Sequence, residues 1–271
     1  MRNNGFTLVE LILVIVIIGI IGIGSVQFIR FGADVYASST ERDEVVAQAR
    51  FALLRITKEL RRATPNSIRL VTSAALPNPY QCLEFAPFVA TSIYLNNPPL
   101  DIANGGDLVV AVFNNEQYAQ AGDRISLYSK QSEDIYDVAR RRVNLLNADP
   151  VVEEANRTQR WSFDNGFATA SPTQRVYALA DSPVSLCVEG NSLYFYQGYN
   201  YAAVQPRPNV NHQLAGVQGQ LLAQYINNTE VFDYTAASLT RNALVNIALD
   251  LGFNDSETLY FNHEVHIPNV P

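Results

Sequence analysis

The chain has 271 residues, of which 48% are hydrophobic and 17% charged, and its formal net charge at pH 7 is -7. This balance excludes a disordered chain, because disorder goes with low hydrophobicity and high charge. The acidic charge argues against nucleic acid as a partner, since a basic face supplies most of that affinity. The length allows one large domain or two small ones.

The chain begins with a short polar leader, residues 1–5, in which Arg2 is the basic residue. An almost unbroken apolar run follows over residues 8–29. As a helix this run would rise about 33 Å, which is enough to cross the core of a bilayer. Arg2 on the short side predicts a cytoplasmic N-terminus and a body beyond the membrane. We therefore expect a single-pass membrane protein.

Glu10 places a carboxyl group near the start of this apolar run. A carboxylate in lipid costs a few kcal/mol or more, and such residues are usually functional and have a specific partner. The structural alternative is that Glu10 reaches the membrane surface, because it lies about one turn into the helix.

The leader and its flank, Gly5-Phe6-Thr7-Leu8-Val9-Glu10, resemble the class III signal of type IV prepilins and pseudopilins at every position. The resemblance implies cleavage between Gly5 and Phe6 by prepilin peptidase and methylation of the new Phe6 amine. It also implies that the Glu10 carboxylate meets the Phe6 ammonium of a neighbouring subunit in a fibre. Either charge alone would be unfavourable in an apolar bundle, so the pair would set the axial register between neighbouring subunits. The implied partners are other pilins and the inner-membrane assembly platform.

Two other interpretations of the N-terminus fit less well. An ordinary signal peptide cut near residues 35–37 would have a shorter apolar core and a more basic start. A plain signal anchor on an unrelated periplasmic domain would need neither Glu10 nor the leader motif. One departure from major pilins is the absence of a helix-kinking proline near residues 25–28. Instead, Gly19, Gly22 and Gly24 lower the helix stability shortly before this point. This departure favours a minor subunit.

The helical pattern continues past the apolar run. Apolar residues recur with a helical period at Val45, Ala49, Ala52 or Leu53, Ile56 and Leu60. Pro65 ends the pattern, so we expect one helix over residues 6–63, with a membrane span at 8–29 and an amphipathic part at 40–63. The remaining faces carry charged residues: Arg42, Arg50, Arg55, Lys58, Glu59, Arg61 and Arg62. A basic stripe such as Arg61-Arg62 is typical of a solvated face, and its functional alternative is contact with an acidic neighbour in a fibre.

Residues 64–271 are expected to form a β-rich globular domain. Short strand-like segments are predicted at 67–71, 82–85, 107–113, 124–128, 176–179, 184–188, 192–199, 230–234, 242–251 and 258–267. The segments around Gly190 predict a hairpin, and the polar stretch 138–172 gives no clear prediction. The expected fold class is α+β, with a long N-terminal helix packed on an antiparallel sheet, which is the type IV pilin-like architecture.

Several later segments resemble the MshO family, the minor pilin-like proteins of the mannose-sensitive haemagglutinin (MSHA) pilus. They are dispersed over most of the chain, at residues 51–63, 65–67, 82–85, 181–199 and 264–271. The resemblance implies a minor subunit that primes or caps the pilus, with its body in the periplasm before assembly. The related J-type pseudopilins of type II secretion and W-type minor pilins stay open as alternatives.

Cys82 and Cys187 each lie in a strand-like segment. In a cytosolic chain they would be two unrelated buried thiols, whereas in an oxidising periplasm a bond closing a loop of about 100 residues would add several kcal/mol. Because the body is expected outside the inner membrane, we predict a disulfide.

No catalytic residue, cofactor or metal is predicted. His263 and His266 flank Glu264-Val265, but on a strand they would point to opposite faces, and the spacing does not fit a helical zinc motif. The sequence has no Gly-x-Ser-x-Gly, phosphate loop or dinucleotide fingerprint. An anchored periplasmic enzyme is therefore a weaker alternative to a fibre subunit.

Two further segments suggest binding. Residues 254–257 are oxygen-rich and could ligate calcium, although calcium usually takes six or more ligands. Tyr194, Tyr196, Tyr199 and Tyr201 could line a carbohydrate-binding surface, although aromatic residues are also common in strands.

Overall fold

The computed structural model describes residues 7–75, 78–100, 104–112, 119–238, 241–254 and 257–268. The chain divides into two compact units, Met1–Ala47 and Gln48–Pro271. A single helix, α1 (Leu8–Leu60), forms most of the first unit and contributes its last turns to the second. Gly19, Gly22 and Gly24 do not interrupt it. It ends three residues before the expected boundary, because Arg62 and Ala63 donate to carbonyls three residues back and tighten the last turn.

The last turns of α1 bury the predicted apolar stripe. Ala49, Ala52, Ile56 and Leu60 are fully buried, as their helical spacing predicts. Glu59 is an exception to the expected solvated face, because it is only 8% exposed. Its carboxylate lies 3.1 Å from the Arg55 guanidinium, one turn earlier, which keeps the buried charge paired.

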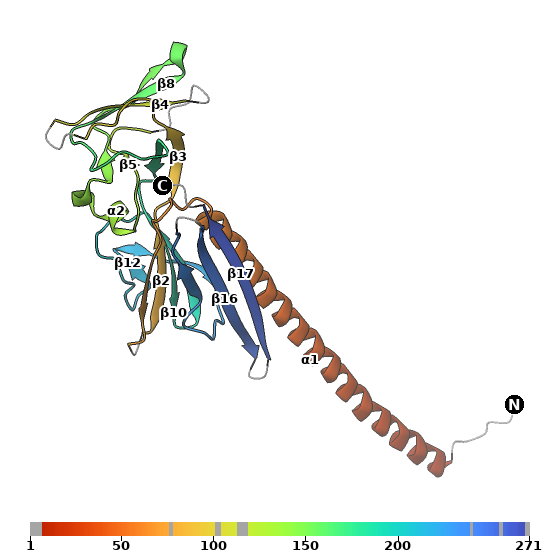
Figure 1. The fold of residues 1–271 in the computed structure, drawn as a ribbon. Coiled ribbons are helices and arrows are strands. Elements are labelled where there is room, and N and C mark those ends of the chain that lie inside the picture. The colour runs from red at the N-terminus through yellow and green to blue at the C-terminus, as the bar shows by residue number, and fades with distance from the viewer. Residues whose placement is uncertain are drawn as a thin grey trace. The chain divides into compact units, whose positions relative to one another are not determined.

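The body that follows is built from antiparallel strands and three short helical segments (Figure 1). The strands are β1 (Arg69–Ser73), β2 (Tyr80–Phe85), β3 (Phe88–Ile93), β4 (Gly106–Ala111), β5 (Arg124–Ser126), β6 (Val143–Leu145), β7 (Val151–Glu153), β8 (Thr158–Phe163), β9 (Arg175–Leu179), β10 (Val184–Glu189), β11 (Ser192–Gln197), β12 (Gln213–Leu214), β13 (Val217–Gln218), β14 (Gln220–Ala223), β15 (Phe232–Thr235), β16 (Ala243–Asn254) and β17 (Glu257–Ile267). The helical segments are α2 (Glu133–Tyr136), η1 (Val138–Arg140) and η2 (Glu154–Asn156).

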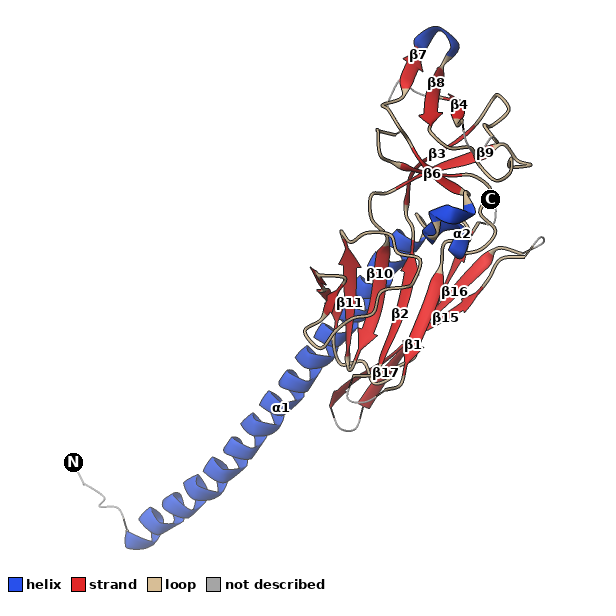
Figure 2. Cartoon of the chain, turned by 90° about the vertical axis from the view of Figure 1, so that its left-hand side faces the viewer, coloured by secondary structure: helices blue, strands red, loops and turns tan. Residues whose placement is uncertain are grey.

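The central sheet has the order β1-β2-β10-β11-β14, and Figure 2 shows its first four strands side by side. Strands β10 and β11 form the predicted hairpin, with Gly190 at a positive φ of 60° that suits glycine. Because side chains alternate along a strand, the sheet has two different faces. One, the helix face, carries the buried Leu83, Leu186 and Phe195, and the Arg55 guanidinium lies 5.0 Å from the Phe195 ring centroid.

The opposite face of the central sheet, the disulfide face, carries Cys82, Glu84, Ser185 and Cys187. It packs against the loop over residues 198–219, the covering loop, through a cluster that includes Tyr199, Leu214 and Val217. The sheet is therefore buried on both sides, which explains why β2 and β10 read as nearly continuous buried strands rather than alternating ones.

Other sheets complete the body. The long hairpin β16–β17 pairs with β15 to form a second sheet, and Gln81 ties this sheet to the central one. Its buried amide donates to the Phe232 carbonyl and accepts from the backbone N–H groups of Val231 and Phe232. Two more sheets, β3-β9-β5-β6 and β4-β8-β7, share a separate core around Trp161, and β12 pairs with β13 alone.

The α+β class with a long N-terminal apolar helix followed by antiparallel sheets is confirmed. The antiparallel strands of the body divide into several sheets rather than joining in one. The polar stretch 138–172, which gave no prediction, contains β6, β7 and β8. In β8 the residues Gln159 and Trp161 are fully buried, and the Trp161 indole N–H donates to the Gln159 side chain two residues away, so the buried indole has a partner.

Candidate functional site

The first candidate site is the apolar segment of α1 over residues 8–29. Every large hydrophobic side chain in this segment is at least 42% exposed. The helix is long and apolar enough to cross a membrane, with a mean hydropathy of 2.8 in its most apolar window, near the N-terminus. So large an apolar surface calls for lipid or other helices around it.

Glu10 lies in the first turn of α1, beside a helix cap. The Glu10 backbone N–H donates to Thr7 Oγ1 over 3.3 Å, and the Leu11 N–H reaches the Thr7 carbonyl. Thr7 with Glu10 three residues on is the pattern of a capping box, a role for this pair that sequence reasoning missed. Among the residues that the structure describes, no side chain pairs with the Glu10 carboxylate, which is exposed. Gly5 and Phe6, the expected cleavage and methylation residues, lie outside the described residues.

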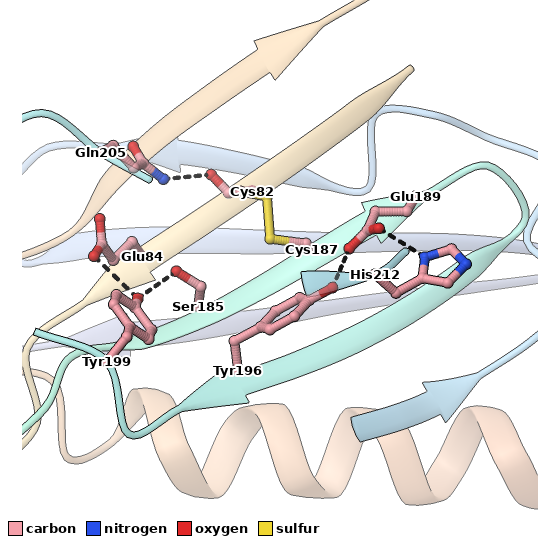
Figure 3. The surroundings of a disulfide bond; sticks show 9 residues. All are labelled: Cys82, Glu84, Ser185, Cys187, Glu189, Tyr196, Tyr199, Gln205 and His212. Carbon is pink, nitrogen blue, oxygen red and sulfur yellow. Dashed lines mark hydrogen bonds and ion pairs between the residues drawn. A yellow bond between two sulfur atoms is a disulfide. The ribbon is translucent and has the colours of Figure 1, made fainter. Parts of the chain in front are cut away.

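The second feature is the bond between Cys82 and Cys187, which face each other across the pairing of β2 with β10 (Figure 3). Their sulfur atoms are 2.07 Å apart, and both residues are fully buried. The Gln205 amide of the covering loop donates to the Cys82 carbonyl over 3.0 Å. The structure thus joins the two cysteines that the sequence analysis paired, and a disulfide in the body is supported.

This bond leads to a stability prediction for the body. Replacing Cys82 and Cys187 together by serine is expected to lower the free energy of unfolding by about 3–5 kcal/mol, because the bond joins residues 105 apart in sequence. Urea denaturation of the purified protein with and without reductant measures the effect. Thiol labelling before reduction is the control: two reactive thiols in the native protein would contradict the bond.

The disulfide face also buries a charged pair formed by Glu84, drawn in Figure 3, and Arg69. Glu84 is fully buried, and its carboxylate accepts from Arg69 Nε over 2.6 Å and from the Tyr199 hydroxyl over 3.0 Å. Ser185 Oγ lies 2.6 Å from the same hydroxyl. Burial raises the pKa of Glu84 above its usual 4.5, and the Arg69 and Tyr199 contacts oppose that rise.

Arg69 connects this pair to the covering loop. Its two terminal nitrogens donate to the carbonyl oxygens of Ala202 and Ala203, each over 2.8 Å. Its guanidinium carbon lies 3.6 Å from the centroid of the Tyr136 ring. One arginine therefore neutralises a buried acid and holds the covering loop. This role depends on the register of β1 with β2, which pairs Arg69 with Glu84, and no sequence motif indicates it.

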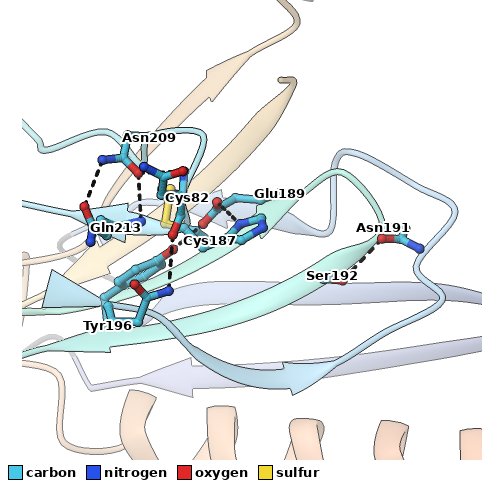
Figure 4. A network of polar contacts seen from close by, with 11 residues as sticks. Cys82, Cys187, Glu189, Asn191, Ser192, Tyr196, Asn209 and Gln213 are labelled. Atoms are coloured by element: carbon cyan, nitrogen blue, oxygen red, sulfur yellow. Dashed lines mark hydrogen bonds and ion pairs between the residues drawn. A yellow bond between two sulfur atoms is a disulfide. The ribbon is translucent and has the colours of Figure 1, made fainter. Parts of the chain in front are cut away.

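A second polar chain surrounds Glu189 at the end of β10 (Figure 4). The Tyr196 hydroxyl donates to one carboxylate oxygen over 2.5 Å, and His212 Nδ1 lies 2.8 Å from the other. The His212 ring stacks on Tyr194 with centroids 4.5 Å apart. Asn209 orders the same loop by accepting from the Gln213 backbone N–H. The arrangement fixes the covering loop onto the sheet.

The tyrosine surface considered from the sequence is wrong for Tyr196 and Tyr199. Tyr196 is fully buried and Tyr199 is 4% exposed, and both hydroxyls are bonded to buried carboxylates. The prediction failed because the covering loop lies over the face of the sheet that these rings occupy. These two are core residues, whereas Tyr194 and Tyr201 are partly buried, and Tyr194 stacks on His212.

The remaining sites considered from the sequence are the two histidines of β17 and the stretch 254–257. His263 and His266 are both exposed on β17, as predicted for strand residues three apart. Within the residues described, no cluster of three or more His, Cys, Asp or Glu side chains could hold a metal ion. The oxygen-rich stretch 254–257 falls in part outside the described residues, and side chains there are not placed.

The basic residues of α1 divide into two groups that the sequence did not separate. Arg50, Lys58 and Arg61 line a groove together with Leu53, Leu54, Thr57 and, from β17, His263. Arg62 is exposed but does not line it. No clear signal for this division is present in the sequence, because Arg62 lies four residues after Lys58, the same spacing that places residues 50, 54 and 58 on one side of a helix.

Comparison with known proteins gives one match. The prokaryotic N-terminal methylation motif matches residues 1–26, which include the leader and most of the apolar run. The chain matches no curated protein and no solved structure. The motif implies processing by prepilin peptidase and assembly with other pilins, and the apolar helix near the N-terminus fits an inner-membrane anchor. Together they support a type IV pilin-like or pseudopilin protein, and the motif suggests a structural subunit.

Proposed function

We propose that this chain is a minor, low-copy subunit that primes or caps a type IV pilus of the MSHA kind. The observation that carries the proposal is the methylation motif at residues 1–26, followed by an apolar helix without neighbours along residues 8–29. The dispersed sequence similarity to the MshO family is what favours this pilus type in the proposal. A body of residues 64–271 with several sheets is large for a subunit that would have to repeat densely along a fibre.

The proposed mechanism begins with the membrane-inserted precursor. Prepilin peptidase removes residues 1–5 and methylates the new amine of Phe6. The mature subunit waits in the inner membrane with its body in the periplasm, where Cys82 and Cys187 are oxidised. Glu10 then pairs with the amino terminus of a neighbouring subunit while residues 8–29 exchange lipid for a bundle of like helices. The pairing removes the cost of two isolated charges in an apolar surrounding.

The mature N-terminus tests this proposal directly. Mass spectrometry of the native protein is expected to find a chain that begins at Phe6 and carries one added methyl group. Gly5→Leu is expected to leave the precursor uncut, since the peptidase needs a small residue before the cut, and still membrane-bound, since α1 is unchanged. A native chain that begins at Met1, or one trimmed near Ala37, would overturn the proposal.

The same motif also supports a minor pseudopilin of a type II secretion pseudopilus. The two functions differ in the phenotype of a deletion, which would remove surface fibres in one case and protein secretion in the other. A membrane-anchored periplasmic enzyme or sugar-binding module is the third candidate, and it predicts a body that is active alone, without partner pilins.

A further inference from the structure

A groove runs along the exposed side of the last turns of α1. Arg50, Leu54, Lys58 and Arg61 follow each other at helical spacing, and Leu53 and Thr57 form the adjacent row. His263 of β17 borders the groove opposite the helix. The groove has a volume of about 800 Å³, and all of its lining residues belong to the unit Gln48–Pro271.

The floor of the groove is apolar and open to solvent. Leu54 is 73% exposed, and Phe51, one turn before it, is 58% exposed. The opposite side of the same turns is fully buried at Ala52 and Ile56, so the helix already has its full apolar stripe inside the body. A second apolar row on the outer side adds nothing to the fold of the single chain, and such rows on a helix mark contact surfaces.

The rim of the groove is cationic. Arg50, Lys58 and Arg61 are exposed, and within the described ranges none of the three makes an ion pair. Arg55, by contrast, is paired with Glu59 on another side of the helix. Lys58 and Arg61 are like charges three residues apart, which repel each other unless an anion lies between them. Three unpaired cations thus gather on a protein whose net charge is -7.

We propose that this groove receives an acidic, amphipathic helix of a different pilin-like subunit in the assembled fibre. The proposal rests on the proposed function and names the partner of its body. Leu54 would enter the apolar side of the partner helix, as in other helix-in-groove contacts. Carboxylates on that helix would meet Arg50, Lys58 and Arg61, which run over about 17 Å of α1. Such rim charges determine which partner binds and how fast.

Two other occupants fit the groove less well. Anionic lipid would suit a cationic, apolar surface, but Arg50 follows the expected span by 21 residues, which is about 32 Å of helix. A second copy of this chain carries an acidic stretch at Glu41, Asp43 and Glu44, but Arg42 lies within it and would bring a cation to a cationic rim. The low copy number that we propose also argues against a contact between like subunits.

Cross-linking in cells tests the contact. A photo-reactive amino acid replaces Leu54 in the full-length protein, and the joined peptides are identified by mass spectrometry. We expect the partner peptide to come from a helix behind another N-terminal methylation leader, with acidic residues next to the joined position. Cross-links to lipid, to a second copy of this chain, or to a helix without acidic residues would each overturn the proposal.

Charge reversal supplies the second arm. Changing Arg50, Lys58 and Arg61 together to glutamate is expected to lower the cross-link yield roughly tenfold. The matched control changes Arg62, Arg207 and Arg241 to glutamate, which alters the net charge equally at exposed positions outside the groove. It is expected to keep the yield. Equal effects of the two sets would overturn the proposal, whereas lysine at the partner's acidic positions should restore the yield of the reversed groove.

Two readouts separate this proposal from the one on which it rests. The mature N-terminus and the resistance of Cys82 and Cys187 to thiol reagents are measured in the same strains. A chain that is not cut before Phe6 would contradict the proposed function. A chain that is cut, oxidised and incorporated into fibres, but whose cross-link yield does not depend on the groove charges, would contradict only the groove proposal. If the triple-reversal variant fails to form the disulfide, two single variants replace the two triple variants. Arg61→Glu then tests the groove, and Arg62→Glu is its control.

Discussion

Glu10→Ala is expected to leave the precursor processed and membrane-bound but to lower its incorporation into fibres at least about a hundredfold. The reason is the cost of burying the ammonium of a neighbouring subunit without a partner, about 3–5 kcal/mol, in a bundle of apolar helices. The apolar residues 8–29, all exposed in the single chain, provide that bundle. Immunoblots of sheared fibres and of membranes measure incorporation and retention separately.

Glu10→Gln is the matched control, because the structure gives Glu10 a second possible role. Thr7 and Glu10 have the pattern of a capping box, in which glutamine serves as well as glutamate. If Glu10 only supports the start of the helix, the glutamine variant assembles normally. If its charge pairs with an amine, glutamine fails as alanine does. Normal piliation with either variant would count against the pairing role.

Arg69→Ala is expected to lower the free energy of unfolding of the body by about 3–5 kcal/mol at neutral pH. The substitution leaves Glu84 fully buried with only the Tyr199 hydroxyl to stabilise its charge. Arg160→Ala is the control, because Arg160 also pairs with a glutamate, at 2.8 Å against 2.6 Å, but the Glu153 side chain is 33% exposed. Loss of that exposed pair is expected to cost about 1 kcal/mol or less.

The pH dependence identifies the buried charge as the cause. Burial raises the pKa of Glu84 in the folded state, so its protonated form favours folding, and this contribution is lost as the pH rises through the folded pKa. Removing Arg69 raises that pKa further. The deficit of the variant is therefore expected to be small near pH 5 and to grow toward about pH 8. Urea denaturation across this range measures it.

A second substitution tests the same cause. Arg69 also holds the covering loop through Ala202 and Ala203, and loss of those contacts would give a deficit that does not depend on pH. Adding Glu84→Gln to Arg69→Ala removes the unpaired charge and is expected to recover part of the stability and to flatten the pH profile. A double variant as unstable as Arg69→Ala at every pH would assign the effect to the loop.

The sequence predicted those features that local pattern determines. The apolar run over residues 8–29, the helical stripe of Ala49, Ala52, Ile56 and Leu60, and the hairpin at Gly190 depend on neighbours a few residues apart. The disulfide was predicted from the expected compartment and from the strand-like segments around the two cysteines. The structure adds that Cys82 on β2 lies directly opposite Cys187 on β10.

What escaped prediction depends on contacts between distant segments. Arg69 meets Glu84 through strand register, and Tyr196 and Tyr199 are buried because a loop from later in the chain covers them. The separation of Arg61 from Arg62 depends on where His263, some 200 residues away in sequence, borders the groove. Strand β8 was missed because its sequence is largely polar, although Thr158 and Gln159 are buried in the folded body.

The buried position of the Cys82–Cys187 bond constrains the order of events during biogenesis. Both cysteines are inaccessible beneath the covering loop once β2 lies beside β10. An oxidant must therefore act on a chain whose loop has not yet closed, and in the proposed function that chain is already anchored in the membrane. Maturation would then depend on a transient open species, and a shortage of oxidant should leave subunits that are delivered and anchored but never completed.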